Sequence, residues 1–280
     1  MPVLPLLRRR ATSSAVHGAI ALLFLIGLVP FIFVLLSSLK TTDQLYDSYW
    51  AFPWPMHLEN YGKAWAQIEP YIVTTVIVAA ASAIGTILLS TGVAFVLARY
   101  RFLGRRLIFV LISCLLMVPS VATLIPLFVM MRDLHLLNTR WAIIIPHVCA
   151  STALAVVLIK SFIEDMPREL FEAATVDGAN GWRLFFHITV PLSLPVLGTV
   201  TLLTVINVWN DFFWPLLTIT ENSLRTISVG LSFFSGQNST DYGPLFAGYI
   251  LASLPLLLLF VFLSKYFLAG MQGGLSGVSK

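Results

Sequence analysis

Six long apolar runs constrain the fold of this chain more than any other feature. A helix that crosses the hydrocarbon core of a bilayer needs about 20 predominantly apolar residues. The runs cover residues 16–39, 70–98, 107–131, 141–162, 191–219 and 244–268. Only 11% of the residues are charged, whereas soluble domains carry about 25%. This deficit excludes a soluble enzyme, a disordered tail and a nucleic-acid binder, and it predicts an all-α membrane protein with six transmembrane helices.

The lysines and arginines are distributed unevenly over the connections between these runs. Twelve of the seventeen lie on the side of the two termini, and five lie on the other side. Cytoplasmic connections carry the excess of basic residues, so we expect a cytoplasmic arm at 1–15, a transmembrane domain at 16–268 and a cytoplasmic tail at 269–280. The net charge of +4 is then explained by the membrane topology and does not indicate nucleic-acid binding. On the opposite side we expect polar connections at 40–69 and 220–243.

The connection at 164–190 is the longest charged one, and it lies between the fourth and fifth runs. Asp165 is the expected N-cap of a short helix whose first turn contains Pro167. Gly178 is the expected left-handed residue that ends this helix. A second short helix, rich in aromatic residues, is expected at 182–189. The sequence therefore predicts two short helices in the cytoplasm.

One face of the first short helix carries small and apolar side chains at spacings of three and four residues. Its members are Leu170, Ala173, Ala174 and Asp177. One interpretation is an amphipathic pair of helices lying on the membrane surface. The segment from Lys160 to His187 has five acidic and three basic residues, which suits anionic headgroups poorly. We favour docking of a soluble partner.

The same segment resembles the EAA loop of ABC importer permeases, whose pattern is E-A-A-x3-G-x9-I-x-L-P. Here Glu172-Ala173-Ala174 is followed by Gly178 and then by Ile188-Thr189-Val190-Pro191, with Val190 as the only departure. The rest of the chain is similar to the shorter permease subunit of carbohydrate importers of the maltose type. Two places depart from that family, Thr74-Thr75 at the start of the second run and the glycine-rich tail. Further matches are Ser38-Leu39-Lys40, Glu59-Asn60-Tyr61, Tyr100-Arg101-Phe102, Leu136-Leu137-Asn138-Thr139 and Trp209-Asn210-Asp211-Phe212.

The resemblance implies a non-catalytic subunit of an ATP-driven sugar importer in a bacterial or archaeal cytoplasmic membrane. The implied partners are a second, homologous permease subunit, two ATPase subunits and an extracytoplasmic solute-binding protein, besides the lipid bilayer and the sugar. The implied mechanism is alternating access. The residues that would couple to the ATPase are Glu169, Glu172, Ala173, Ala174, Asp177 and Gly178. The chain has no G-x-x-x-x-G-K-[ST] motif, so we expect it to bind no cofactor, with ATP and Mg on the ATPase subunits.

A polar and aromatic group near the end of the fifth run is a candidate for the substrate pathway, because polar groups at membrane depth mark functional sites. Its members are Asn207, Trp209, Asn210, Asp211, Phe213 and Trp214. The alternative is an interfacial aromatic belt in which a polar group ends the helix.

The remaining reactive side chains predict no metal or disulfide chemistry. Cys114 and Cys149 lie inside apolar runs, and the spacing of the histidines, His147 among them, fits no metal site. Two alternative functions stay open: an ABC permease for a solute other than a sugar, and an ion-coupled carrier, although no internal repeat supports the carrier. An intramembrane enzyme is disfavoured because no run contains paired catalytic groups.

Overall fold

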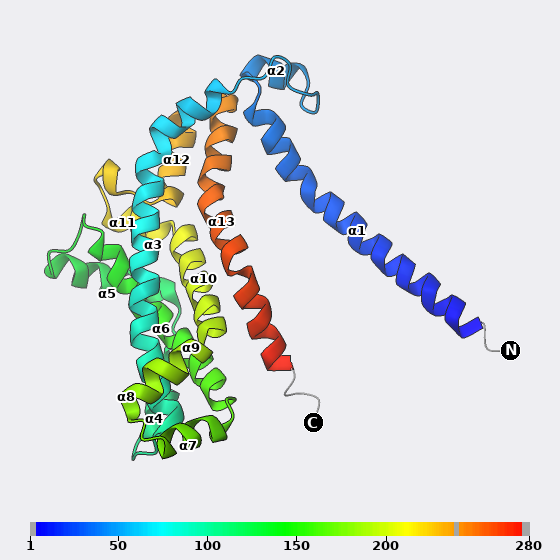
Figure 1. The fold of residues 1–280 in the computed structure, drawn as a ribbon. Coiled ribbons are helices and arrows are strands. Elements are labelled where there is room, and N and C mark those ends of the chain that lie inside the picture. Colours follow the sequence, from blue (N-terminus) through cyan, green and yellow to red (C-terminus); the bar gives the residue numbers. More distant parts are fainter. Residues whose placement is uncertain (1–3, 238–240, 276–280) are drawn as a thin grey trace. The chain divides into compact units, whose positions relative to one another are not determined.

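The computed structural model describes residues 4–237 and 241–275 (Figure 1). Within these ranges the chain is α-helical and contains no strand. It divides into two compact units. Unit 1 comprises the described residues of 1–67 and 233–252, and unit 2 those of 68–232 and 253–280. Each unit is described separately below.

Unit 1 is built from helix ends and one structured loop. It holds α1 (Leu4–Ser38), α2 (Thr42–Asp47), the start of α3 (Glu59–Arg99), the end of α12 (Ile227–Gln237) and the start of α13 (Tyr242–Leu275). Helix α1 begins inside the predicted arm at 1–15. Of the predicted tail at 269–280, residues 269–275 form the end of α13, and 276–280 lie outside the described residues.

The loop between α1 and α3 closes on buried polar groups. Lys40 is only 1% exposed, and its ammonium donates hydrogen bonds to the carbonyl oxygens of Ser48 (2.7 Å) and Tyr49 (3.1 Å). The side-chain amide of Asn60 donates to the carbonyl oxygens of Ser38 and Lys40, both at 3.0 Å. A buried ammonium needs such partners because burial without them is costly.

Two further contacts complete this loop. Thr41 and Gln44 form a reciprocal capping box at the start of α2. Gly243, at the start of α13, packs against the Lys40 carbonyl and the Asn60 side chain, where an added Cβ would collide with both. The connection predicted at 40–69 is therefore structured: it contains α2, and α3 begins at Glu59 and continues through Pro70.

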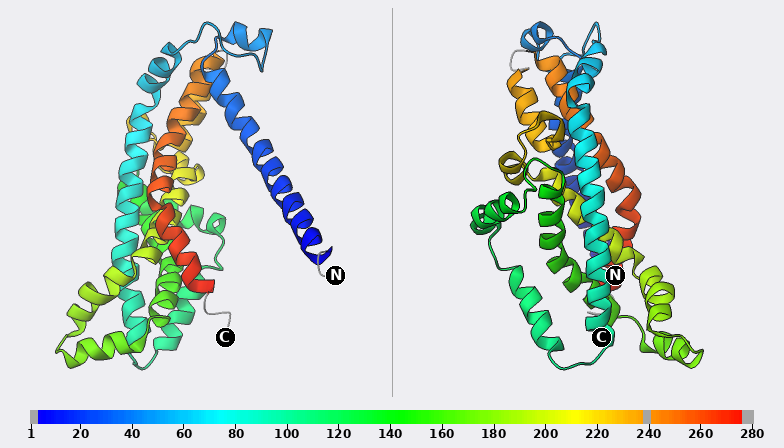
Figure 2. Two further views of the ribbon diagram at one scale, coloured as in Figure 1. Left: turned by 45° about the vertical axis from the view of Figure 1, so that its right-hand side comes forward. Right: turned by 90° about the vertical axis from the view of Figure 1, so that its left-hand side faces the viewer.

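Unit 2 contains the rest of the helices (Figures 1 and 2). They are the remainder of α3, α4 (Arg105–Leu115), α5 (Ser120–Asp133), α6 (Trp141–Glu164), α7 (Arg168–Val176), α8 (Gly181–Arg183), a π-helix (Leu184–Thr189), α9 (Val190–Leu192), α10 (Leu194–Asn210), α11 (Phe213–Thr218), a 3-10 turn (Asn222–Leu224), and the adjoining parts of α12 and α13.

Among the described residues, four helical segments are long and apolar enough to cross a membrane, and up to six spans result if each of two bent helix pairs counts as one. The four are Val16–Ser38, Glu59–Arg99, Trp141–Glu164 and Tyr242–Ser264. The bent pairs are Arg105–Leu115 with Ser120–Asp133, at 96°, and Gly181–Leu192 with Leu194–Asn210, at 70°. The third and fifth runs were predicted as unbroken spans, and that detail is wrong.

Prolines account for both breaks. Pro119 stands directly before α5 and disfavours helical backbone at the residue before it. Pro195, in the first turn of α10, has no N–H to bond to the carbonyl four residues earlier and its ring would clash with that carbonyl, so a helix cannot run on unchanged from α9. The fifth run also stops earlier than predicted, since α10 ends at Asn210 and α11 starts anew at Phe213. The whole of α12 lies in the connection predicted at 220–243.

The core of unit 2 lies between α3, α6 and α10, and the segment after α6 packs onto it. The buried cluster includes Phe95 of α3, Ile159 of α6, Phe171 of α7 and Leu197 of α10. Nearer the start of α3, two hydroxyl groups form hydrogen bonds to the chain around the beginning of α12. The Thr74 hydroxyl donates to the Ser223 carbonyl, and the Thr75 hydroxyl accepts from the Ile227 N–H. The two threonines that depart from the family pattern thus have a structural role.

Candidate functional site

The segment from α7 to α9, residues 168–192, begins at a firmly held helix end. Glu164, the last residue of α6, pairs with Arg105 of α4 at 2.8 Å and with Lys160 at 2.6 Å. Asp165 follows as the C-cap of α6 and Pro167 occupies the N-cap position of α7. The prediction that Asp165 caps α7 is wrong, because α6 continues through Glu164 and the chain breaks at Met166, the residue before proline.

Helix α7 is anchored by one aromatic residue. Phe171 is 2% exposed and packs into the core of unit 2. The guanidinium carbon of Arg99, the last residue of α3, lies 3.5 Å from the centre of the Phe171 ring. A cation over an aromatic face adds to the apolar packing. Sequence reasoning missed both residues; the signal was the aromatic side chain directly before Glu172.

Gly178 ends α7 as predicted, with a φ of +80°. The Ala179 N–H donates to the Ala174 carbonyl at 2.9 Å, and the Gly178 N–H donates to the Thr175 carbonyl at 3.0 Å. These two bonds define a Schellman motif, which requires the left-handed backbone that glycine adopts without steric cost. The side chain of Asn180 then caps α8 by accepting from the Arg183 N–H.

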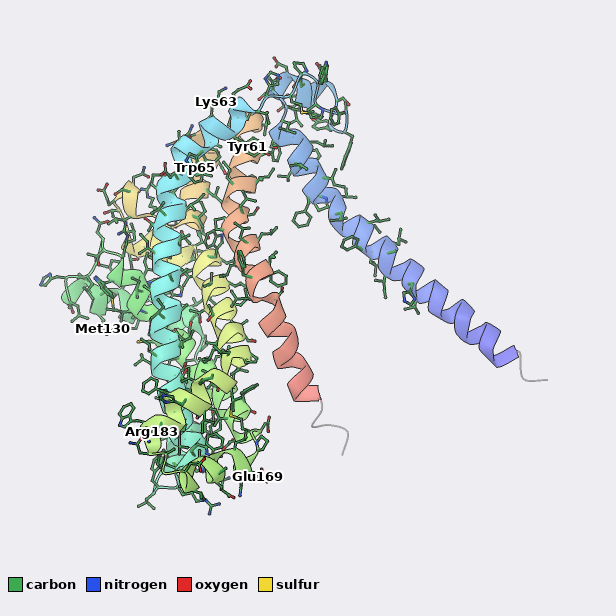
Figure 3. All side chains as sticks on the ribbon, in the orientation of Figure 1. Tyr61, Lys63, Trp65, Met130, Glu169 and Arg183 are labelled. Carbon is green, nitrogen blue, oxygen red and sulfur yellow. The ribbon has the colours of Figure 1, made fainter. Side chains whose placement is uncertain are left out.

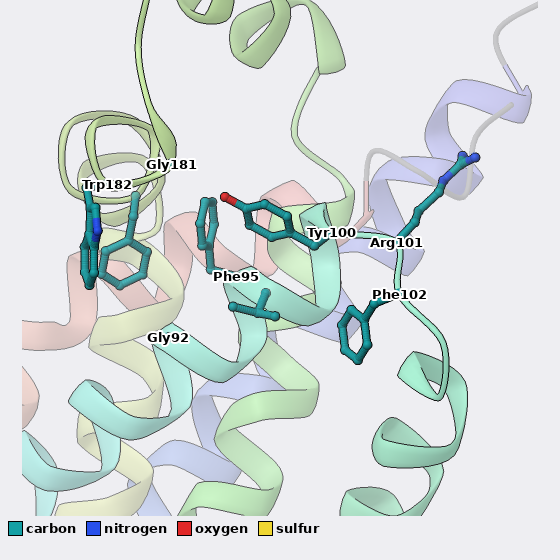
Figure 4. A pocket seen from close by; sticks show the side chains of 9 residues that line it. Gly92, Phe95, Tyr100, Arg101, Phe102, Gly181 and Trp182 are labelled. Atoms are coloured by element: carbon teal, nitrogen blue, oxygen red, sulfur yellow. The ribbon is translucent and has the colours of Figure 1, made fainter.

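The second predicted short helix is present but irregular. After α8 the chain forms a π-helix over Leu184–Thr189, and the Thr189 hydroxyl donates to the Leu184 carbonyl. Such π-turns occur often at functional sites. Trp182 and Phe186 stack with ring centres 5.9 Å apart. Trp182 also lines an apolar groove of about 830 Å³ with Phe95, Tyr100 and Phe102 (Figure 4).

The outer surface of the α7–α9 segment combines exposed apolar and acidic side chains. Val176 is 87% exposed and Trp182 is 72% exposed. The side chains of Glu169 and Arg183 lie at the same end of unit 2 (Figure 3). The predicted coupling residues Glu169, Glu172, Ala173, Asp177 and Gly178 are exposed, and Ala174 is half-buried. This surface can receive a partner with apolar pockets and basic groups.

A separate cleft of about 630 Å³ lies at the other end of α10. It is lined mainly by residues of α5, α6 and α10, by Asp211 and by the start of α11. Five of the six predicted pathway residues line it: Asn207, Asn210, Asp211, Phe213 and Trp214. Trp209 does not; it is 8% exposed, and its carbonyl accepts a hydrogen bond from the Ser228 hydroxyl.

Asp211 is the charged centre of this cleft. It lies in extended backbone directly after α10, and its Oδ1 accepts a long hydrogen bond of 3.4 Å from the Trp214 N–H. Its Oδ2 lies 3.1 Å from Nε2 of His147 on α6, a close pair whose angle is outside hydrogen-bond geometry. The structure thus brings His147, which sequence reasoning set aside, to the predicted residues. No sequence signal connects these two positions.

The aromatic residues of the cleft differ in role. Trp214 is 5% exposed, and its indole N–H donates to the Ala142 carbonyl at 2.8 Å. This tie fixes α11 to α6. Phe213 is 69% exposed, so its ring is free to contact a ligand in the cleft. Among the described residues no group of three or more His, Cys, Asp or Glu could hold a metal ion.

Apolar helices with a two-helix connection before the penultimate apolar run are typical of transport permeases. Comparisons with known proteins agree with this class. Residues 90–273 match the model of the family described as "Binding-protein-dependent transport system inner membrane component". The chain belongs to this family.

Relatives and a solved structure cover most of the chain. The probable ABC transporter permease protein YurM of Bacillus subtilis is 35% identical over 90% of this chain and 85% of that protein. The diacetylchitobiose uptake system permease protein NgcG of Streptomyces coelicolor is 33% identical over 90% of this chain and 84% of that protein. A bacterial ABC transporter that imports the acidic polysaccharide alginate has the same fold, with a TM-score of 0.79 and 23% identity over 92% of this chain and 97% of that chain.

Proposed function

We propose that this chain is a permease subunit of an ATP-driven sugar importer in the cytoplasmic membrane of a bacterium or archaeon. Family membership carries the proposal, together with a relative that serves diacetylchitobiose uptake. The chain forms half of the translocation pathway beside a second, homologous permease subunit. An extracytoplasmic binding protein delivers the sugar.

The α7–α9 segment is the part that couples the chain to the ATPase subunits, where ATP and Mg bind. Three observations support this role: exposed apolar residues beside acids, the left-handed turn at Gly178, and the anchor at Phe171. Because Phe171 contacts Arg99 of α3 and packs with residues of α6 and α10, a movement imposed on α7 reaches three helices directly. Alternating access then follows from a shift of these helices between two packed arrangements.

The sugar crosses along the cleft that contains Asp211. Its lining offers amide and hydroxyl groups from Asn207, Asn210 and Ser151, together with the exposed ring of Phe213. Sites that bind polar ligands combine apolar walls with a few placed polar groups. With both termini in the cytoplasm, the α7–α9 segment faces the ATPase and the cleft faces the extracytoplasmic half of the membrane.

The test is ATP-dependent uptake in proteoliposomes that contain the chain, its second permease, both ATPase subunits and the binding protein. We expect sugar uptake with ATP in the ATPase compartment and none when the phosphate-loop lysine of the ATPase is replaced. Ion gradients are dissipated by ionophores as a control. Uptake that persists without ATP but stops with the ionophores would identify an ion-coupled carrier and contradict the proposal.

A further inference from the structure

The ionisable groups on the walls of the cleft are few. Among its seventeen lining residues only Asp211 and His147 can carry a charge, and none is a lysine or arginine. Arg140 lies two turns before His147, at the start of α6, and does not line the cleft. Arg132, in the last turn of α5, pairs with Asp133 at 2.9 Å and does not line the cleft. The cleft therefore offers a carboxylate with no lysine or arginine on its walls, and the basic group beside it is the His147 imidazole, which is charged only when protonated.

The Asp211 carboxylate has spare capacity to accept hydrogen bonds. Two carboxylate oxygens offer about four acceptor sites. Within the described part of the chain Asp211 accepts one hydrogen bond, the long one from the Trp214 N–H, and His147 Nε2 lies 3.1 Å from its Oδ2. Its side chain is 23% exposed, compared with 12% for His147. A sugar hydroxyl can donate to such an oxygen, whereas a ligand carboxylate would face charge repulsion that a low-dielectric wall strengthens.

On the basis of the function proposed above, we propose that Asp211 makes this cleft a charge filter, which admits sugars that bear no negative group and excludes sugars that carry a carboxylate. Asp211 is thus a specificity-determining residue of the permease itself, in addition to any selection by the binding protein. The polar neighbours Asn207 and Asn210 are uncharged and serve both kinds of sugar equally, so the discrimination depends on Asp211.

The experiment measures the charge preference of the cleft with small thiol reagents. In the assembled complex carrying Cys114→Ser and Cys149→Ser, Asn207→Cys places a thiol about one helical turn before Asp211. Its rates of modification by a cationic and an anionic methanethiosulfonate are compared at pH 8, with and without Asp211→Asn. One unit charge about 6 Å away changes the ratio of the two rates by about tenfold even in a water-like dielectric.

We expect the cation-to-anion rate ratio at position 207 to fall by about tenfold in the Asp211→Asn complex. Thr220→Cys, exposed and outside the cleft, is the matched control and should keep its ratio. An unchanged ratio at position 207 would overturn the proposal.

A second readout tests the substrate class. When a panel of sugars is offered to the binding protein and complex, we expect ATP-driven uptake of uncharged sugars only, and uptake of a uronate-containing sugar would overturn the filter. The labelling experiment does not require transport. An unchanged labelling ratio would therefore contradict the charge filter alone, whereas a complex that takes up no sugar at all would contradict the proposed function.

Discussion

At the scale of single residues, one ring connects the α7–α9 segment to the core. Phe171 is buried while its neighbours Leu170 and Glu172 are exposed. The Arg99 guanidinium covers the ring from the end of α3. Phe171 therefore joins the outward-facing surface of α7 to α3, α6 and α10.

Replacing Phe171 by alanine should uncouple the complex. Loss of a buried phenylalanine typically costs about 3–5 kcal/mol, and here that cost falls on the attachment of α7. We expect ATP hydrolysis to continue while the sugar transported per ATP falls several-fold. Phe171→Leu keeps most of the apolar volume and should retain more coupling. Unchanged sugar-to-ATP stoichiometry in Phe171→Ala would show that α7 needs no such anchor.

Gly178 supports a second prediction, which concerns backbone conformation alone. An added Cβ would meet no atom within 4 Å, so any effect comes from the φ of +80°. A left-handed conformation costs roughly 1–2 kcal/mol for an ordinary residue, and more for a β-branched one. Gly178→Val should reduce ATP-driven uptake strongly. Gly178→Asn should retain most of it, because asparagine tolerates this region. Equal uptake by the two variants would contradict this explanation.

Whether the position of such a residue can be predicted depends on how far away in the sequence its interaction partners lie. The left-handed turn at Gly178 is a local property, and the sequence predicts it correctly. Phe171 and Arg99 are 72 positions apart in the chain, and His147 and Asp211 lie on different helices. Which residues meet across helices depends on packing, which hydrophobic periodicity does not encode.

At the scale of elements, close helix packing depends on one glycine of α3. A Cβ on Gly85 would lie 2.8 Å from Cγ2 of Val148 on α6. Small residues at such positions let membrane helices approach closely. The same helix carries Gly92, seven positions later, where an added Cβ would meet nothing within 4 Å.

This pair allows a matched test of stability. Gly85→Leu should destabilise the detergent-solubilised complex, because overpacking costs typically about 1–3 kcal/mol. Gly92→Leu should be nearly neutral, since it gains helix propensity without a clash. The measurement is the temperature at which half of the protein is lost from the monodisperse peak in size-exclusion chromatography. A lower half-loss temperature for Gly92→Leu than for Gly85→Leu would contradict the close contact between Gly85 and Val148.

The sequence predicts that the apolar runs form helices, but it does not predict where those helices break. Four of the six apolar runs match the four long helices, and the third and fifth runs overlap the two bent pairs. The prolines at 119 and 195 were visible in the sequence, yet a proline can either kink or end a membrane helix. The structure shows bends of 96° and 70°, and hydropathy cannot distinguish these outcomes. Helices α2 and α12 were missed because short helices in polar connections give a weak signal.

At the scale of the whole molecule, charge distribution carries the proposed orientation. Twelve of the seventeen basic residues lie on one side of the predicted spans. Arg106, in the first turn of α4, is exposed on the proposed cytoplasmic side, and Thr220, after α11, is exposed on the other.

Cysteine labelling checks this orientation. In right-side-out vesicles of a strain with Cys114→Ser and Cys149→Ser, Thr220→Cys should react with a membrane-impermeant maleimide. Arg106→Cys should react only after the vesicles are permeabilised, because its side chain then becomes reachable. Labelling of Arg106→Cys in sealed vesicles would reverse the proposed topology.

The buried loop after α1 has a consequence for biogenesis. The hydrogen bonds of Lys40 and Asn60 connect residues no more than 22 positions apart, and local contacts form early in folding. This loop can therefore close as soon as the first part of α3 has been synthesised. Gly243 contacts the finished loop about 180 residues later. The first-made part of the permease thus becomes the template on which its last helix is assembled.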